Sequence, residues 1–314
     1  MHRQPVDSAS LGLPVVRVEG AVKRFGSSTA LAGLEFELGP GEWLGLLGAN
    51  GAGKTTAMHA IAGLVDLDDG SIEVFGRRVH GPNPQLIGWV PQEIALYPFL
   101  TGRENLQAFG RLHSLRGGQL VEAERWALDW TGLESRADER VTTYSGGMKR
   151  RLNIACGVLH RPRVLLLDEP TVGVDPQARE RILDMLEGVR ADGTALLQST
   201  HEFGDLERTS DRLVIMDEGR TIASGTVEQL VAETVGNEAA LMLEVEGNLS
   251  REHFDDSICL DGSTVAAKLH DVVEELPRLL AEIQQAGGRV VELDVRRPGI
   301  AEAFMHLTGR DLRE

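Results

Sequence analysis

The sequence is poor in cysteine and in aromatic residues, and it contains no long apolar run. Its two cysteines, Cys156 and Cys259, stand far apart among 314 residues, which argues against a disulfide framework or a zinc site. No uninterrupted apolar stretch approaches the roughly 20 residues that span a bilayer. Residues 1–14 have no sustained apolar segment either, so we interpret them as a flexible leader and not as a secretory signal.

Positive charge is also scarce. Lysine and arginine number 32 against 48 aspartates and glutamates, which gives a formal net charge of −16. This balance argues against nucleic acid as a partner, because nucleic-acid binding needs a basic stripe or patch. Residues 226–314 carry more than half of the excess, with 18 acidic and 8 basic side chains. We interpret that acidic tail as a solvated, solubilising face.

A glycine-rich loop stands between an apolar strand and a helix. Segment 48–56 follows the phosphate-loop pattern, in which a glycine and four free positions precede Gly-Lys-Thr. Backbone N–H groups and the helix dipole at such a helix start attract a polyanion. Lys54 is expected to reach the β- and γ-phosphates of a nucleotide, and the Thr55 hydroxyl to ligate Mg²⁺. The predicted nucleotide-binding residues of this loop are Gly48, Asn50, Gly51, Ala52, Gly53, Lys54, Thr55 and Thr56.

Two carboxylates follow a second apolar strand. Asp168 and Glu169 come directly after the run 164–167, and adjacent residues at a strand end point in different directions. Asp168 is therefore expected to join the Mg²⁺ shell, while Glu169 orients or deprotonates an attacking water. His201 stands just past the next predicted strand, 195–200. In a parallel sheet these side chains and the glycine loop meet at the carboxyl ends of the strands.

The order of elements predicts two domains. Strands and helices alternate through residues 15–230, which indicates a doubly wound α/β domain, and segment 15–19 is interpreted as its edge strand. A helical block from about 93 to 156 breaks this rhythm and is interpreted as a helical subdomain. The pattern changes again over 231–314, which predicts a small α+β accessory or regulatory domain.

A further motif reveals a family resemblance. Ser145, Gly146 and Gly147 combine a hydroxyl with two bare backbone N–H groups at a helix start, which makes a second anion site. Over about residues 15–230, the motifs of this chain together resemble those of the nucleotide-binding subunit of ATP-binding-cassette (ABC) transporters. The motifs that carry the resemblance are Phe25, 48–56, Gln92, 145–147, 165–169, 174–176 and His201. The resemblance implies a P-loop NTPase fold: a RecA-like core with an antiparallel β subdomain and a helical subdomain.

The resemblance also implies a role for each motif. It makes Phe25 the aromatic that stacks on adenine, and His201 the switch that contacts the γ-phosphate. Gln92 would sense Mg²⁺ and water and touch the membrane subunit. The signature 145–147 would contact ATP held by the opposite subunit, and Asp175 would face that subunit. ATP and Mg²⁺ are the implied ligands, and a head-to-tail homodimer is the implied assembly.

Two residues depart from the commonest form of the family signature, and four sequence segments indicate one branch of the family. Tyr144 and Met148 stand where the commonest family version has leucine and glutamine, but the serine and glycines remain, so ATP hydrolysis is expected to survive. Four segments resemble the daunorubicin-resistance-like branch of ABC exporters, namely 100–106, 144–151, 169–176 and 303–310. That branch pairs the ATPase with a separate integral-membrane permease. The resemblance therefore implies a cytoplasmic protein, peripheral on the cell membrane through the permease, that energises export of drug-like or other hydrophobic compounds.

Three alternatives remain at this point. A soluble ABC ATPase of DNA repair or translation is disfavoured, since those relatives typically carry a long coiled coil or two cassettes. An importer subunit stays open, because the motifs of the ATPase do not set the direction of transport. A regulatory module, in which the acidic tail senses a ligand or partner, is the third.

Overall fold

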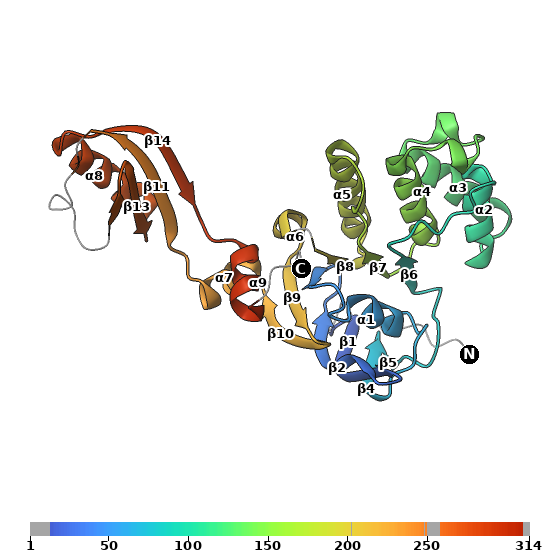
Figure 1. Cartoon of the computed structure of the whole chain (residues 1–314). Coiled ribbons are helices and arrows are strands. Elements are labelled where there is room, and N and C mark those ends of the chain that lie inside the picture. The colour runs from blue at the N-terminus through green and yellow to red at the C-terminus, as the bar shows by residue number, and fades with distance from the viewer. Residues whose placement is uncertain (1–12, 202, 248, 250–257, 310–314) are drawn as a thin grey trace. The chain divides into compact units, whose positions relative to one another are not determined.

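The computed structural model describes residues 13–201, 203–247, 249 and 258–309 (Figure 1). Most of the predicted leader, residues 1–12, lies outside these described ranges. Contacts within the chain divide it into two compact units, with the boundary between Thr226 and Val227. No described helix is both long and apolar enough to cross a bilayer.

The first unit contains an antiparallel sheet of four strands in the order β2-β1-β4-β5. The strands are β1 (Val16–Phe25), β2 (Ser28–Leu38), β4 (Asp69–Val74) and β5 (Arg77–Arg78). The prediction of an edge strand at 15–19 is wrong, because β1 pairs with β2 on one side and with β4 on the other. The partner on the second side comes from much later in the chain, and the local pattern gave no sign of it.

The larger sheet carries the predicted loop and carboxylates. Its order is β10-β9-β3-β8-β7-β6, and all neighbouring pairs are parallel except β10 with β9. The strands are β3 (Trp43–Gly48), β6 (Ile87–Val90), β7 (Val164–Asp168), β8 (Ala195–Thr200), β9 (Arg212–Asp217) and β10 (Arg220–Gly225). Every residue of β3, β7 and β8 is buried, as expected for strands covered on both faces.

Alternate residues of these strands enter two different cores. Leu44 and Leu166 pack with the antiparallel sheet and α1 (Lys54–Ile61). Trp43 and Leu165 pack instead with α5 (Pro176–Ala191) and the helical subdomain. A short helix, α6 (Phe203–Thr209), follows β8. Packing on both faces fixes the strand ends, where the polar side chains stand.

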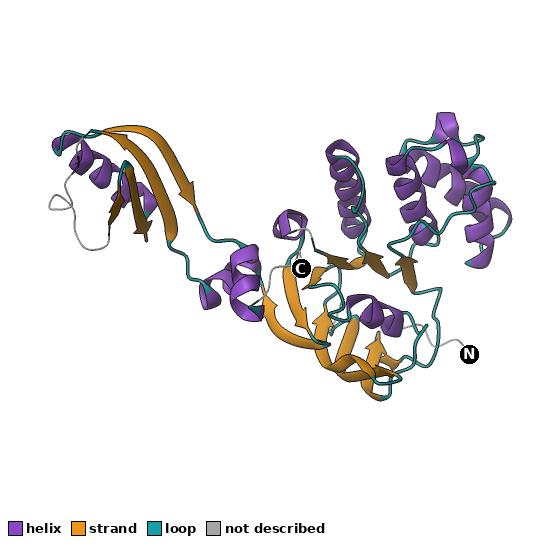
Figure 2. Cartoon of the chain, viewed as in Figure 1, coloured by secondary structure: helices purple, strands orange, loops and turns teal. Residues whose placement is uncertain are grey.

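A group of helices follows β6 and precedes β7 in the sequence, and it forms the cluster of purple helices at the upper right of Figure 2. It comprises α2 (Gly102–Leu112), α3 (Gly117–Thr131), α4 (Gly146–Val158) and two 3₁₀ turns, η2 (Glu134–Arg136) and η3 (Val141–Thr143). A capping box starts α2, in which Thr101 accepts from the Glu104 backbone and the Glu104 side chain accepts from Thr101 N. The predicted helical block is therefore present.

The second unit is a four-stranded antiparallel sheet with one long helix against it. The strand order is β12-β13-β11-β14. The elements are α7 (Val227–Thr234), β11 (Ala239–Glu246), β12 (Cys259–Asp261), β13 (Thr264–Leu269), α8 (Val272–Gln285), β14 (Arg289–Arg296) and α9 (Ile300–Thr308). The core lies between the sheet and α8, while α7 packs on α9.

Candidate functional site

The glycine loop joins β3 to α1 and has the backbone of an anion cradle. Gly51 and Gly53 have φ of 83° and 102°, in the left-handed region that glycine adopts without strain. A Cβ on Gly53 would lie 2.4 Å from the carbonyl oxygen of Ala30 in β2. The sequence therefore needs glycine at this position to bring the loop against the antiparallel sheet and to start α1 at Lys54.

Lys54 is a buried cation held by the loop itself. Its Nζ donates to the carbonyl oxygen of Gly48 and, at 3.1 Å, to that of Ala49. Burial lowers the pKa of Lys54, while the charges of Glu169 and Asp168 act in the opposite direction. A polyanion entering the loop would meet this ammonium together with the N-terminus of α1.

Asp168 is held by two hydroxyl groups at the end of β7. The Thr55 hydroxyl donates to Asp168 Oδ2 at 2.8 Å, and the Ser199 hydroxyl donates to Asp168 Oδ1. Hydroxyl and carboxylate oxygens are the protein ligands that Mg²⁺ takes beside phosphate oxygens. Thr55 and Asp168 therefore fit a magnesium ion. Sequence reasoning missed Ser199, although a polar side chain inside a buried strand is a signal, and β8 places it directly beside Asp168.

Glu169 and His201 form a pair across the ends of β7 and β8. The Nδ1 atom of His201 lies 2.9 Å from Glu169 Oε1 and 2.8 Å from Oε2. Glu169 is buried, and its N–H donates to the Ser199 carbonyl at 3.1 Å. Its φ is 51°, which is a strained value for a residue with a side chain. This left-handed conformation at the strand end accompanies the contact between the Glu169 carboxylate and His201.

Arg150 is a buried residue that sequence reasoning missed. Its guanidinium donates to the carbonyl oxygens of Gln92 at 2.7 Å, Pro91 at 3.4 Å and Val172 at 3.3 Å. Burial lowers the pKa of Arg150, and the Glu169 charge partly opposes that shift. One side chain of α4 thus ties the segment after β6 to the segment after Glu169. The only sequence signal was a run of three basic residues just after the signature.

The signature motif starts α4 at the surface. Ser145 caps the helix, with its hydroxyl accepting from Met148 N at 3.3 Å, and Ser145 and Gly146 are exposed. Tyr144 is buried in the helical subdomain, and its hydroxyl donates to the Arg136 carbonyl at 2.7 Å. The departure at Tyr144 is thus a packing feature of this subdomain and leaves the serine and the glycines accessible.

The remaining predicted residues stand at other exposed positions. Phe25 ends β1 with 53% of its surface exposed, and Lys23 Nζ lies 5.4 Å from the centre of its ring. Gln92 follows β6 and is exposed. Asp175 caps α5, where its carboxylate accepts from Ala178 N at 3.0 Å. The structure thus brings together Lys54, Thr55, Asp168, Glu169 and His201 at the carboxyl ends of β3, β7 and β8. The roles of Phe25, Gln92, the signature and Asp175 stay predictions.

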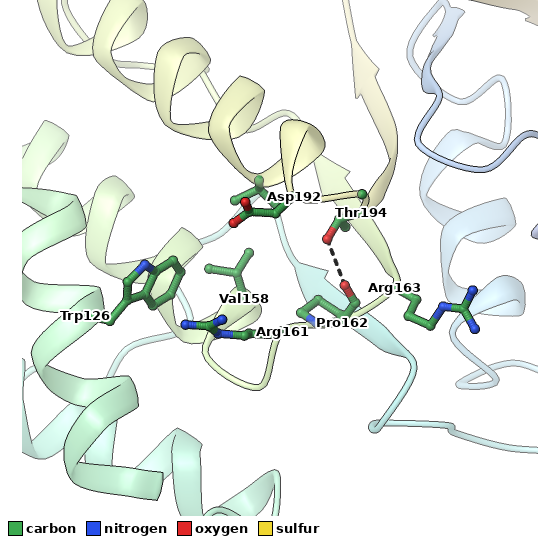
Figure 3. Close-up of a pocket in the computed structure, with 9 residues that line it drawn as sticks. Trp126, Val158, Arg161, Pro162, Arg163, Asp192 and Thr194 are labelled. Carbon is green, nitrogen blue, oxygen red and sulfur yellow. Dashed lines mark hydrogen bonds between the residues drawn. The ribbon is translucent and has the colours of Figure 1, made fainter. Parts of the chain in front are cut away.

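A pocket of about 390 Å³ lies at the opposite ends of β7 and β8 (Figure 3). The Arg161 guanidinium lies 5.6 Å from the Trp126 ring, and Thr194 Oγ1 donates to the Pro162 carbonyl at 2.9 Å. Figure 3 shows Arg163 pointing away from these side chains. None of the predicted site residues lines this pocket, so it is separate from the cluster of Lys54, Thr55, Asp168, Glu169 and His201.

Comparison with known proteins agrees with the nucleotide-binding site that the structure describes. The ABC transporter family model matches residues 31–172. The linearmycin resistance ATP-binding protein LnrL of Bacillus subtilis (strain 168) is 37% identical, over 96% of this chain and 100% of the relative. The daunorubicin resistance ATP-binding protein DrrA3 of Streptomyces coeruleorubidus is 36% identical, over 95% of this chain and 97% of the relative.

Two further similarities extend this result. The Nod factor export ATP-binding protein I of Ralstonia nicotianae (strain ATCC BAA-1114 / GMI1000) is 33% identical, over 100% of this chain and 99% of the relative. A solved ATP-binding subunit of an ABC transporter superposes with a TM-score of 0.63 at 28% identity, over 70% of this chain and 92% of that chain. The predicted P-loop cassette fold is confirmed. Because relatives match along nearly their whole length, the chain belongs to the ATP-binding proteins of ABC transporters.

Proposed function

We propose that this chain is the ATP-hydrolysing subunit of an exporter, and that it drives drug-like or other hydrophobic compounds through a separate integral-membrane permease. The observation that carries the proposal is the contact of the buried Glu169 carboxylate with His201, next to Asp168 and close enough to Lys54 for their charges to interact. The names of the relatives, which refer to linearmycin resistance, daunorubicin resistance and Nod factor export, support export over import.

ATP binds in the cradle of the glycine loop. Lys54 leaves the loop carbonyls and neutralises the β- and γ-phosphates, while the N–H groups at the start of α1 surround them. The exposed Phe25 ring stacks on adenine, because a flat apolar ring covers a base without needing hydrogen bonds. Thr55, Asp168 and Gln92 would hold Mg²⁺, which would neutralise phosphate charge.

Hydrolysis uses the strand-end pair. Glu169 accepts a hydrogen bond from the attacking water and takes its proton as the water oxygen bonds to the γ-phosphorus, while the bond from that phosphorus to the bridging oxygen breaks and ADP leaves. His201 fixes the orientation of the Glu169 carboxylate through Nδ1, and we assign its Nε2 atom to the γ-phosphate. Ser199 holds Asp168 and receives the Glu169 N–H, so it sets the positions of both carboxylates.

Two surfaces then link turnover to transport. The signature, with Ser145 and Gly146 exposed and Gly147 half-buried, contacts ATP held by a second copy in a head-to-tail homodimer, with Asp175 facing that copy. A groove of about 250 Å³ between β6, α2 and α4 presents apolar side chains, among them Trp89 and Phe109. This groove receives a cytoplasmic element of the permease, which places the protein peripherally on the cytoplasmic face of the membrane.

The Glu169→Gln variant tests the assignment. It should bind ATP and form the ATP-bound dimer, while steady-state hydrolysis falls by a factor of about 10²–10⁴, the contribution of a positioned general base. Glu122→Gln, an exposed change on α3, is the matched control and should hydrolyse ATP normally. Unchanged hydrolysis in Glu169→Gln would sink the proposal. A tagged protein purified with ADP or ATP from its own membranes should also retain a polytopic membrane protein.

A further inference from the structure

The sheet of the second unit has one covered and one open face. Residues of β11 alternate between buried and exposed along the whole strand. Leu241, Leu243 and Val245 pack into the core with Leu279 and Ile283 of α8. The exposed residues of β11 lie on the other face, and Met242 at its centre has 54% of its surface accessible. An exposed sheet face centred on methionine is a candidate contact surface.

Strand register arranges the open face in three rows. Paired residues of antiparallel strands point to the same side, so the pairing defines each row. The first row is basic and contains Lys268, Ala240 and Arg296. The middle row is mostly small or apolar and contains Cys259, Ala266, Met242 and Asp294. The third row is acidic and contains Asp261, Thr264, Glu244 and Glu292.

The charged rows are only partly neutralised within the unit. Arg296 contacts Asp294 at 2.7 Å and Lys268 contacts Glu238 at 3.7 Å, yet both basic side chains are about 80% exposed. Glu244 lies directly opposite Glu292, a like-charged cross-strand pair that destabilises a sheet. The acidic row therefore favours a partner that brings cations.

We propose that the open face binds the same face of a second copy of this chain. The two-fold axis lies between the two faces, runs along the middle row and is perpendicular to the strands. A half-turn about that axis exchanges the basic and acidic rows. Arg296 then faces Glu292 of the second copy, and Lys268 faces its acidic row. The match is mutual because each charged row lies two residues, roughly 7 Å, from the axis. A purely basic partner would satisfy only the acidic row.

The face is small, and this determines when it assembles. Three rows across four short strands cover less than the roughly 1,000 Å² of a stable interface. The ATP-dependent cassette dimer, which rests on the proposed function, would hold two second units at high effective concentration. The contact then becomes intramolecular, so a weak face suffices. It should form most completely in the ATP-bound dimer and loosen when the cassettes part.

Cys259 provides a direct test in the full-length chain. It lies in the middle row and is exposed, whereas Cys156 is buried and burial raises the pKa of its thiol. Face-packed sheets are about 10 Å apart, so a bis-maleimide of that span should join Cys259 of one copy to Cys259 of the other. The Glu169→Gln background keeps the dimer closed. We expect a crosslinked dimer with ATP and none in the Cys259→Ser control.

Charge reversal distinguishes this face from chance proximity. Arg296→Glu should lower the crosslinked fraction about tenfold, because it places like charges across the axis. Adding Glu292→Arg should restore the crosslink, since the exchanged pair is again complementary. Labelling with a monofunctional maleimide and circular dichroism show whether each variant is folded with Cys259 accessible. A crosslink that ignores Arg296→Glu, or that the double variant fails to recover, would overturn the proposal.

The same experiment separates this face from the cassette assignment. At raised protein concentration without nucleotide, a fainter crosslink should appear and follow the same charge pattern. If the cassette assignment fails, the ATP dependence disappears while the charge pattern stays. If the face assignment fails, ATP hydrolysis of the Glu169 wild-type protein persists while the charge pattern disappears. Crosslinks from Cys259 to a membrane protein, with none to itself, would also refute the proposed occupant.

Discussion

Arg150 should control turnover without controlling nucleotide binding. The side chain projects from α4, just after the signature, and donates to carbonyls of the segment after β6 and of the segment after Glu169. It touches neither the glycine loop nor Asp168 in these contacts. We therefore treat it as a positioning residue that holds Gln92 and the segment at Val172 in register with Glu169.

The magnitude follows from the three hydrogen bonds. The 2.7 Å bond to the Gln92 carbonyl is the strongest, and the bonds of 3.3 and 3.4 Å are weaker. A hydrogen bond to a charged group contributes about 1.5–3 kcal/mol. If turnover needs this order, Arg150→Gln should lower kcat by a factor of about 10–100, since each 1.36 kcal/mol is tenfold. Arg150→Lys keeps the charge but replaces the guanidinium fork with a single ammonium nitrogen, so its kcat should lie between those of wild type and Arg150→Gln.

Steady-state ATPase kinetics and equilibrium nucleotide binding provide the assay. We expect kcat to fall while the affinity for ATP stays within about twofold, because Lys54 and the loop glycines are untouched. Arg125→Gln, an exposed change on α3, is the matched control. Thermal unfolding of each variant is measured first, so that the ATPase assay is run at a temperature at which every variant is folded. Wild-type kcat in Arg150→Gln, or a fall in ATP affinity equal to the fall in kcat, would refute the reasoning.

Two further predictions concern the Ser199 hydroxyl that donates to Asp168 and the half-buried His160. Ser199→Ala removes a donor to Asp168, so the Mg²⁺ concentration for half-maximal hydrolysis should rise about 10–100-fold; an unchanged Mg²⁺ titration would contradict this. His160 has a pKa lowered to about 4 by burial and by His113, whose ring stacks on it at 3.8 Å. The unfolded chain then binds the extra proton, so stability should be full above pH 6.5 and fall toward pH 4 by roughly 2–3 kcal/mol. Urea unfolding at two pH values, in wild type and in His160→Asn, measures it; equal pH dependence in both proteins would count against the assignment.

The site could be predicted where its signals were local. The loop, Asp168 and Glu169 each stand at a strand end that the apolar run itself marks, and parallel pairing then brings the ends together. Ser145 followed the same logic, because a serine before a helix caps it. These features depend on a few neighbouring residues and on one rule of sheet topology.

The features that were missed depend on partners distant in sequence. Ser199 and Arg150 acquire their roles only when β8 lies beside β7 and α4 lies over two loops. The inner place of β1 depends on β4 in the same way. The β12–β13 hairpin is a different omission, since Gly262-Ser263 between two short strands is a recognised hairpin signal, with glycine at the first loop position. The three-residue length of β12 hid it.

The left-handed backbone at Glu169 creates a trade-off between the stability of the protein and its activity. A glycine there would relax a conformation that costs a side-chain-bearing residue about 1–2 kcal/mol, and it would also remove the carboxylate. Laboratory evolution that rewards heat resistance alone would therefore drift toward an inactive protein at this position. A stabilised version of the chain should be sought in the α7–α9 pair or at solvent-exposed helix positions, with residue 169 held fixed.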